Sequence, residues 1–552
     1  MSMTVMLFPA VQSMSSHFYH HANKSINPIA EGIEPNMQST QKQQLKNFAT
    51  RIAKYATHID AEELILSQYN IPVSIKTNSK LLFNSRTRSL VKLSSQEYQQ
   101  LTNITELSEA KLKYFVANGF LVKKATNELE QLAVQFHKLR TNTSSLNLTL
   151  APSLGCNLAC GYCFQGQDKA KDKFDDTVSQ AIVDHLAMQK DTLTHLGITW
   201  YGGEPLMAKP VLLKLADKMI ALCDMNNINY NSSIITNGYL LTVETALELY
   251  ARRCTWAQIT IDGPEEIHDK MRPKLNGHGS FKKIIDNICA VVTQTPMTIN
   301  TRVNVGQDNL EHCESLLYDL HQLGIAKTGR FSLYFAPIDA STAESGDAFN
   351  QSLPKKVFNQ KIIELTRLGE KLGLIRPKSA PNSFLGMCVA AKNNGLVVAA
   401  NGDLHKCWET MHDPDKKIGT IFDYNNALKS RNNQLWNQWS PFDNDVCRSC
   451  KILPLCGGMC SHRFVYHGEG DQQSTPCPDW KWNTAENIFT RALNAGVVKA
   501  SDWLESQATI DTKISGERHN SKSLQASQIT LKNKLNKLGY KNNTIIHIQS
   551  VG

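Results

Sequence analysis

The chain has 552 residues, of which 41% are hydrophobic and 20% charged, and its formal net charge is +9. This length allows several domains with buried cores and excludes a small scaffold that depends on disulfide staples. The Lys and Arg residues are scattered, which favours a mildly basic surface over a nucleic-acid site. The apolar runs fall short of the ~20 residues of a membrane span, and the start, MSMTVMLFPA, lacks the basic flank of a signal peptide. We therefore expect a cytoplasmic protein with no membrane partner.

Fourteen cysteines argue against a disulfide framework in a chain without a leader, because reducing compartments keep thiols free for metal or redox work. Ten of them form two groups, one over residues 156–163 and one over residues 388–477. The other four stand singly within helical or strand-like patterns. We expect these four to be buried apolar side chains: Cys223, Cys254, Cys289 and Cys313.

The first part of the chain divides into a tail and a small domain. Residues 1–45 are rich in Ser, Asn, Gln and His, and we expect them to be disordered. Residues 46–145 predict a small α+β domain, with a strand, a turn and a second strand over 80–94 and helical patterns over 95–101 and 111–122.

Residues 146–377 alternate short β-rich runs with helix-length amphipathic stretches, which is typical of α/β folds. One helix is expected over 309–324, with Asp308 as its cap and Gly324 as its stop. Right-handed crossovers between six strands predict a parallel sheet that forms a partial barrel, whose active residues collect at the carboxyl ends of the strands. The six strands are predicted at 146–151, 197–201, 232–236, 257–262, 298–305 and 330–336.

The first cysteine group has the pattern Cys156-x3-Cys160-x2-Cys163 and follows the first predicted strand. Three thiolates can hold a 4Fe-4S cluster and leave its fourth iron open for chemistry, whereas a closed structural site normally supplies four ligands. Taken alone, the triplet also fits a zinc site that borrows a distant ligand.

The second strand ends in WYGGEPL, which contains Gly202, Gly203 and Glu204. Paired glycines let the backbone approach a ligand closely, and a carboxylate accepts hydrogen bonds from an ammonium group. Together with the cysteine triplet and with Tyr162 just before its last cysteine, this turn resembles the radical S-adenosylmethionine (SAM) enzymes.

That resemblance implies how the residues would act. The open iron of the cluster at Cys156, Cys160 and Cys163 would bind the methionine end of SAM, and one electron would cleave SAM to a 5'-deoxyadenosyl radical. Gly202, Gly203 and Glu204 would hold the amino group of SAM. The third and fourth strands end in SSIITNG and ITIDGPEEIHD, which resemble the peptide-oxidising branch of the family and imply cofactor contacts at Ser233, Thr236, Asn237 and Asp262. Secondary candidates at the fifth strand are Arg302 and Asn304.

Seven cysteines of residues 378–482 resemble the SPASM domain, which is named for the subtilosin, pyrroloquinoline quinone, anaerobic sulfatase and mycofactocin maturases. The resemblance implies two auxiliary 4Fe-4S clusters. One would be held by Cys447, Cys450, Cys456 and Cys477, and the other by Cys388, Cys407 and Cys460. The alternative is a pair of zinc ribbons, because C-x2-C hairpins suit zinc equally well.

Two positions depart from the pattern of the relatives. Fully ligated relatives carry an eighth cysteine where this chain has Asn382. The cluster of three cysteines therefore has an open iron unless a substrate thiol, water, His405 or His412 fills it. Sulfatase maturases also place a catalytic carboxylate directly after the cysteine that matches Cys407, where this chain has Trp408 and then Glu409.

The resemblance implies an oxidoreductase with three 4Fe-4S clusters and SAM that modifies a ribosomally made precursor peptide. A thioether or carbon-carbon crosslink is expected, because oxidative closure releases an electron that auxiliary clusters can receive. The alternatives are maturation of a whole protein, either a sulfatase or a quinone-cofactor enzyme, and a zinc-ribbon module that binds nucleic acid.

Further partners and the ends of the chain complete this hypothesis. A flavodoxin or ferredoxin is the expected electron donor, since such carriers are acidic and this chain is basic. The domain over 46–145 resembles those that bind a leader peptide as an added strand, although its residues do not distinguish leader binding from plain packing. Residues 483–552 are predicted to form a helix and a polar tail.

Overall fold

The computed structural model describes residues 59–504, apart from residues 168, 343, 377–386 and 467–476, together with the short strand β1 (Val5–Met6). The predicted tail over 1–45, Asn382 and the predicted polar end after residue 504 lie almost entirely outside the described residues. Within the described part, no helix is both long enough and apolar enough to cross a membrane.

Six consecutive strands form the parallel sheet that the sequence predicts. They lie in the order β12-β11-β10-β9-β8-β7, and every neighbouring pair is parallel. The α/β prediction and the positions of all six strands are confirmed. The strands are β7 (Ser145–Ser153), β8 (His195–Gly202), β9 (Asn229–Thr236), β10 (Cys254–Thr260), β11 (Thr298–Val305) and β12 (Phe331–Pro337).

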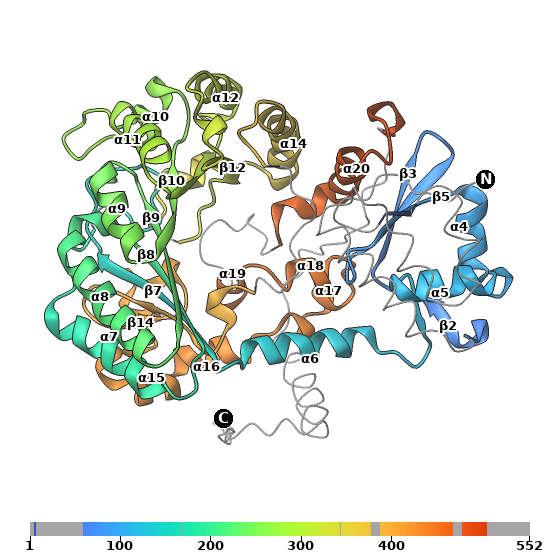
Figure 1. The fold of residues 1–552 in the computed structure, drawn as a ribbon, viewed down its shortest axis with the longest axis horizontal. Coiled ribbons are helices and arrows are strands. Elements are labelled where there is room, and N and C mark those ends of the chain that lie inside the picture. The colour runs from blue at the N-terminus through green and yellow to red at the C-terminus, as the bar shows by residue number, and fades with distance from the viewer. Residues whose placement is uncertain are drawn as a thin grey trace.

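Helices that follow these strands along the chain cover one side of the sheet (Figure 1). Their apolar faces meet the buried strand residues in one large core, which buries the side of each helix that the periodicity marks as hydrophobic. The helices are α7 (Asp176–Gln189), α8 (Lys209–Met225), α9 (Val243–Ala251), α10 (Glu265–Met271), α11 (Phe281–Gln294), α12 (Cys313–Gln322) and α14 (Lys355–Lys371).

One predicted helix differs in its first turn. The predicted cap Asp308 is wrong: a 3-10 turn (Leu310–His312) precedes α12, and its cap position is Asn309. The Asn309 side chain is held elsewhere, since its Oδ1 accepts from the amide of Gly306 at 2.8 Å. Gly324 ends the helix as predicted, with a left-handed φ of 66° that glycine tolerates.

The second cysteine-rich region continues the sheet. Strand β13 (Gly395–Val398) pairs in parallel with β7, and β14 (Asp403–His405) and β15 (Gly419–Thr420) extend the sheet in antiparallel fashion. Short helices follow. They are α15 (Tyr424–Lys429), α16 (Arg431–Gln438), α17 (Asp445–Arg448), α18 (Leu453–Cys456) and α19 (Ser461–Val465). Of these, α17 contains Cys447 and α18 contains Cys456.

The N-terminal domain stands apart from the barrel and is joined to it by the long helix α6 (Glu128–Arg140), as Figure 1 shows. Its main sheet has the order β1-β5-β4-β3, so β3 is an outer strand. The predicted strand pair over 80–94 is confirmed. The elements are β2 (Leu64–Leu66), β3 (Asn70–Ile75), β4 (Ser79–Asn84), β5 (Leu90–Ser94), α4 (Ser95–Thr102), α5 (Glu109–Ala117) and β6 (Leu121–Lys123).

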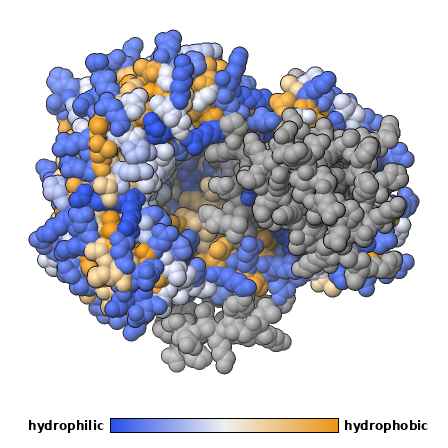
Figure 2. All heavy atoms as spheres, in the orientation of Figure 1, coloured by the Kyte–Doolittle hydropathy of each residue, from blue (hydrophilic) through white to orange (hydrophobic). Residues whose placement is uncertain are grey.

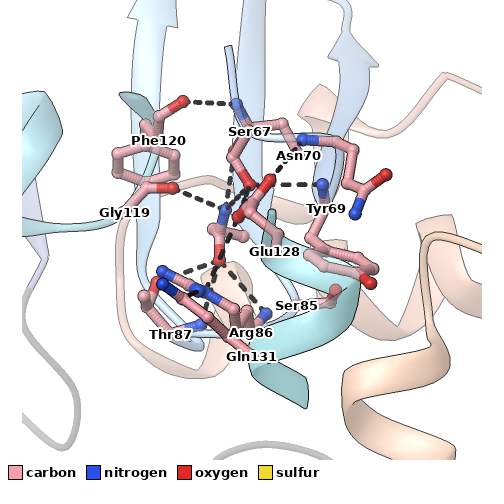
Figure 3. A network of polar contacts seen from close by, with 12 residues as sticks. Ser67, Tyr69, Asn70, Ser85, Arg86, Thr87, Gly119, Phe120, Glu128 and Gln131 are labelled. Carbon is pink, nitrogen blue, oxygen red and sulfur yellow. Dashed lines mark hydrogen bonds and ion pairs between the residues drawn. The ribbon is translucent and has the colours of Figure 1, made fainter. Parts of the chain in front are cut away.

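A buried polar network fastens α6 to this domain (Figure 3). The carboxylate of Glu128, only 5% exposed, accepts from the Ser67 hydroxyl at 2.8 Å and from the amide of Gln68 at 2.9 Å. Arg86 lies 3.6 Å from the same carboxylate. Farther along the chain, α20 (Thr484–Asn494) packs on β3 and β4 in a shared apolar cluster.

Candidate functional site

The cysteine loop leaves β7 at the carboxyl edge of the sheet, where the barrel rule expects chemistry. Cys160 is buried, whereas Cys156 and Cys163 are partly buried. Burial, together with the charges of Cys163 and Cys156, raises the pKa of Cys160 to about 11. The three thiols of the predicted catalytic cluster therefore lie close together.

The Gly-Gly-Glu turn packs directly against this loop. The amide of Gly203 donates to the carbonyl of Ser153 at 3.0 Å, and that of Glu204 donates to the carbonyl of Gly155 at 2.9 Å. A Cβ at Gly202 would lie 2.3 Å from the carbonyl oxygen of Ser153. The glycines are thus required by the close approach of two backbones, and this contact fixes the cysteine loop on the end of β8.

Glu204 is fully buried, and its carboxylate is held by the neighbouring strand. It accepts from the Thr236 hydroxyl at 2.8 Å, from the amide of Asn237 at 2.8 Å and from the amide of Leu206 at 3.0 Å. Burial raises the pKa of Glu204, while these hydrogen bonds lower it. These three hydrogen-bond donors of the protein fix the orientation of the Glu204 carboxylate.

Asn237 also reaches the cysteine loop. Its Nδ2 donates to the Asn157 side chain at 2.7 Å and lies 3.7 Å from the thiol of Cys156. The structure therefore brings the ends of β7, β8 and β9 to one point. Ser233 lies in the middle of β9, partly buried, three residues before Thr236.

Tyr162 and Asp262 meet in a second buried network. The Tyr162 hydroxyl donates to Asp262 and accepts from Nη1 of Arg272 at 2.6 Å and from Nδ2 of Asn304 at 3.2 Å. Asp262 is fully buried and lies 3.6 Å from Nη1 of Arg272. Burial raises the pKa of Asp262, and the charge of Arg272 opposes that rise.

Arg272 was missed by the sequence reasoning. It follows α10, and the sequence pattern there marks only an exposed helix end. In the structure the Arg272 side chain is only 8% exposed. Burial raises the pKa of Cys160, and the charge of Arg272 opposes that rise. A buried cation beside three thiols is suited to an anionic group at the cysteine loop. Arg302 lies nearby, with its Nε donating to Asn304 at 2.5 Å.

The second region holds two separate thiol groups. Cys447, Cys450, Cys456 and Cys477 line one cavity together with Lys481, whose Nζ lies 3.4 Å from the Cys477 sulfur. Burial raises the pKa of Cys447, and the charges of the other three thiols raise it further. The other group is formed by Cys388, Cys407 and Cys460. Burial raises the pKa of Cys407, and the charges of Glu409, Cys388 and Cys460 raise it further.

Among the described residues, no three or more His, Cys, Asp or Glu side chains converge closely enough to hold a single metal ion. The thiolates of an iron-sulfur cluster bind different irons and lie farther apart than the ligands of one ion. The binding of clusters by these sets of three, four and three cysteines stays a prediction of the sequence.

An aromatic wall of Phe164, Tyr201 and Trp408 runs from the cysteine loop to the second region. The Tyr201 ring stacks on Phe164 with centroids 6.4 Å apart and lies 5.3 Å from the ring of Trp408. Burial raises the pKa of Tyr201, with Cys163 and Cys407 both adding to the rise. Figure 2 shows the surface hollowed beside the barrel, with apolar side chains on its floor. Sequence reasoning did not single out Tyr201, although it directly precedes the Gly-Gly-Glu turn.

Comparisons with known proteins agree with this geometry. Residues 150–317 match the family described as the Radical SAM superfamily. The serine-type anaerobic sulfatase-maturating enzyme of Klebsiella pneumoniae is 24% identical over 321 residues, which cover 55% of this chain and 78% of the relative. The mycofactocin maturase MftC of Mycobacterium ulcerans is 25% identical over 333 residues, covering 58% and 84%.

A similar solved structure is that of SuiB from Streptococcus suis bound to S-adenosylmethionine, at 14% identity and a TM-score of 0.43, covering 73% of this chain and 97% of that one. Enzymes of the matched superfamily use a 4Fe-4S cluster and SAM. The matched residues contain the whole cysteine loop and the turn packed against it. Residues 150–317 therefore form a radical SAM domain, and the curated relatives that this chain resembles are enzymes.

Proposed function

We propose that this enzyme is a maturase that modifies a ribosomally made peptide or protein, as its relatives from Klebsiella and Mycobacterium are named to do. The observation that carries the proposal is the aromatic wall of Tyr201, Phe164 and Trp408. Its rings follow Cys163 on one side and Cys407 on the other, so a substrate bound along them would be close to both cysteine regions.

The residues at the loop fit the cofactors of the superfamily. Cys156, Cys160 and Cys163 would hold a 4Fe-4S cluster, and Glu204 would receive the amino group of SAM, helped by Gly202 and Gly203. When bound, these cofactors supply a 5'-deoxyadenosyl radical that takes hydrogen from unactivated carbon. Ser233, Thr236, Asn237, Tyr162 and Asp262 are proposed as the cofactor-side residues.

The protein's own contribution is to orient and to exclude water. Thr236 and Asn237 hold the Glu204 carboxylate in one position. Arg272 provides a fixed positive charge behind Cys160, in a site where low polarity strengthens electrostatic interactions. Tyr201 and Trp408 give the substrate an apolar wall that keeps solvent from the reacting carbon.

The two further thiol groups are proposed to hold auxiliary clusters, one at Cys447, Cys450, Cys456 and Cys477 and one at Cys388, Cys407 and Cys460. A thioether or carbon-carbon crosslink is the proposed product, because such closure is an oxidation and leaves an electron for these clusters to accept. Maturation of a sulfatase is the second candidate, supported by the names of the relatives. The position after Cys407 is Trp408, so a carboxylate base is not found where sulfatase maturases carry it.

The outer strand β3 is the proposed place for a leader peptide. An outer strand offers unpaired backbone groups to which an extended peptide can add. Beside it lies a cavity of about 550 Å³, whose walls come from both the N-terminal domain and the second cysteine-rich region. Its lining includes the apolar side chains Leu66, Pro72, Leu82, Tyr98 and Leu101 and the cations Arg448 and Lys451.

The test is to search the neighbouring genes for a small open reading frame, to co-express it with this protein and to analyse the product by mass spectrometry. A loss of two hydrogens per modification supports a crosslink, and an unchanged mass with altered stereochemistry supports epimerisation instead.

Replacing Cys156, Cys160 and Cys163 by Ala should abolish both deoxyadenosine formation and product. The control is Cys289→Ala, since Cys289 lies partly buried on α11. Deoxyadenosine from the triple variant would reject the catalytic assignment.

A further inference from the structure

Buried polar atoms without hydrogen-bond partners gather beside the thiols of Cys407 and Cys460. They are Oε2 of Glu409, Oγ of Ser461 and both ring nitrogens of His462. Buried polar atoms in folded proteins are nearly always paired. Each of these residues lies within two positions of a thiol proposed to bind iron, so the atoms belong to the two segments that carry Cys407 and Cys460.

Glu409 is the carboxylate among them. It lies on the 3-10 turn Trp408–Thr410, and its amide donates a hydrogen bond to the sulfur of Cys407. Its Oε2 is 3.4 Å from Nδ1 of His462, without hydrogen-bond geometry. The turn follows Cys407, and the Glu409 side chain contacts a residue two positions after Cys460.

The contact between Glu409 and His462 brings together the segments that carry Cys407 and Cys460, and the charge of Glu409 acts on all three thiols. After desolvation, the charge of Glu409 is the largest influence that raises the pKa of Cys388, of Cys407 and of Cys460. Cys388 is exposed as a residue, and desolvation nevertheless raises the pKa of its thiol. The negative charge of one carboxylate therefore influences all three cysteines.

The two histidines considered from the sequence are engaged elsewhere. Nδ1 of His405 lies 3.1 Å from the Thr410 hydroxyl, and the charges that act on this ring are Asp403, Asp413, His412 and Lys417. Nε2 of His412 lies 3.1 Å from Glu344.

We propose that the carboxylate of Glu409 is the fourth protein ligand of the auxiliary iron-sulfur cluster held by Cys388, Cys407 and Cys460. One iron-oxygen bond would form, and no electron would be transferred. Carboxylates are established iron ligands, and a histidine beside such a ligand commonly orients it, which gives His462 a role. This inference rests on the proposed function, because that function supplies the cluster.

The same arrangement accounts for the departure at Trp408. The residue directly after Cys407 turns its ring toward Tyr201, and the carboxylate one position later lies against His462, two residues after Cys460. A carboxylate bound to iron is not free to act as a base on substrate. This chain thus has an iron-binding carboxylate at Glu409 in place of a substrate-facing carboxylate at position 408.

The experiment uses full-length protein carrying Cys156→Ala, Cys160→Ala and Cys163→Ala, so that only the auxiliary clusters contribute to the spectra. After anaerobic reconstitution with iron-57 and sulfide, this protein should bind about eight irons, as two 4Fe-4S clusters require. Mössbauer spectra should contain one iron with an oxygen ligand. Cyanide should leave the EPR spectrum of the reduced protein unchanged, because no iron is open.

Two variants in this background test the ligand. Glu409→Ala should open one iron, so that cyanide shifts its EPR signal. Glu409→Cys should keep about eight irons and give Mössbauer spectra with sulfur ligands only. The matched control is Glu344→Ala, which removes another carboxylate of the same region and should behave as the background protein does.

Two results separate the possible failures. A background protein that binds zinc in place of iron and sulfide would reject the proposed function itself. A background protein with about eight irons, whose EPR response to cyanide is the same as that of its Glu409→Ala variant, would overturn the ligand proposal alone.

Discussion

A single methyl group added at Gly203 would displace the cysteine loop. A Cβ at this position would lie 2.4 Å from the carbonyl oxygens of both Leu154 and Gly155, which is far inside contact distance. We predict that Gly203→Ala loses about a third of the bound iron, measured by iron and sulfide analysis, because one of three clusters depends on this loop. Gly155→Ala is the control, since its Cβ would meet the nearest atom at an ordinary 3.6 Å. Equal iron in both variants would contradict the prediction.

Arg272 is predicted to stabilise the folded chain through its buried partner. Removing the guanidinium leaves the fully buried Asp262 without its cation, so Arg272→Met should lower the free energy of unfolding by about 3–5 kcal/mol. The measurement is urea unfolding of the metal-free protein. The exposed pair Arg253 and Asp224 is the comparison, and Arg253→Met should cost about 1 kcal/mol or less. Similar losses of unfolding free energy in the two variants would show that the buried pair of Arg272 and Asp262 stabilises the fold no more than the exposed pair does.

The site residues differ in how far the sequence could reveal them. Glu204, Thr236 and Asn237 each lie at the end of a strand, so the parallel-sheet rule was enough to bring them together. Arg272 follows a helix, and no local pattern shows that its side chain turns inward to Tyr162. The direction of Glu409 depends on a turn whose geometry is settled only when the neighbouring cysteines are in place.

At the scale of elements, the contact between α7 and α15 contains a pH-sensitive histidine. His185 is 1% exposed and packs on the Tyr424 ring with centroids 4.2 Å apart. Burial lowers the pKa of His185 to about 4, from 6.5. The unfolded chain therefore takes up a proton that the folded chain excludes, and the contribution to stability is lost as the pH falls from about 6.5 towards 4.

We predict that wild-type protein loses about 2 kcal/mol more stability than His185→Gln does between pH 7.5 and pH 5. Urea unfolding of the metal-free protein at both pH values measures the difference. Glutamine keeps a polar side chain but has no proton to gain in this range. Parallel losses in the two proteins would mean that other groups control the acid sensitivity.

Element periodicity explains why the barrel strands were predictable and the extension of the sheet was not. Each strand from β7 to β12 alternates with a helix, and this order alone implies neighbouring parallel strands. Strand β13 has only four residues, and its partner is the first strand of the barrel. No local sequence pattern reveals a pairing between segments so far apart. The sequence therefore predicts the second cysteine-rich region as a separate domain.

For the whole molecule, this pairing predicts that the radical SAM domain does not fold alone. A chain that ends at residue 376 would leave the apolar edge of β7 without β13, and an uncovered strand edge promotes aggregation. We expect this truncated chain to be insoluble or aggregated by size-exclusion chromatography. A chain that ends at residue 504 keeps every described contact of the sheet and should elute as a single soluble species. A soluble, folded product from the shorter chain would contradict the prediction.

The partnership of β7 and β13 also sets an order of events during synthesis. Strand β7 leaves the ribosome roughly 250 residues before the strand that covers its edge, and at typical elongation rates the delay is tens of seconds. During that time the nascent barrel has one open side next to the very loop that carries the first three cysteines. Delivery of iron and sulfide to that loop is therefore best timed after translation, when the edge has closed and a premature, oxygen-exposed assembly is avoided.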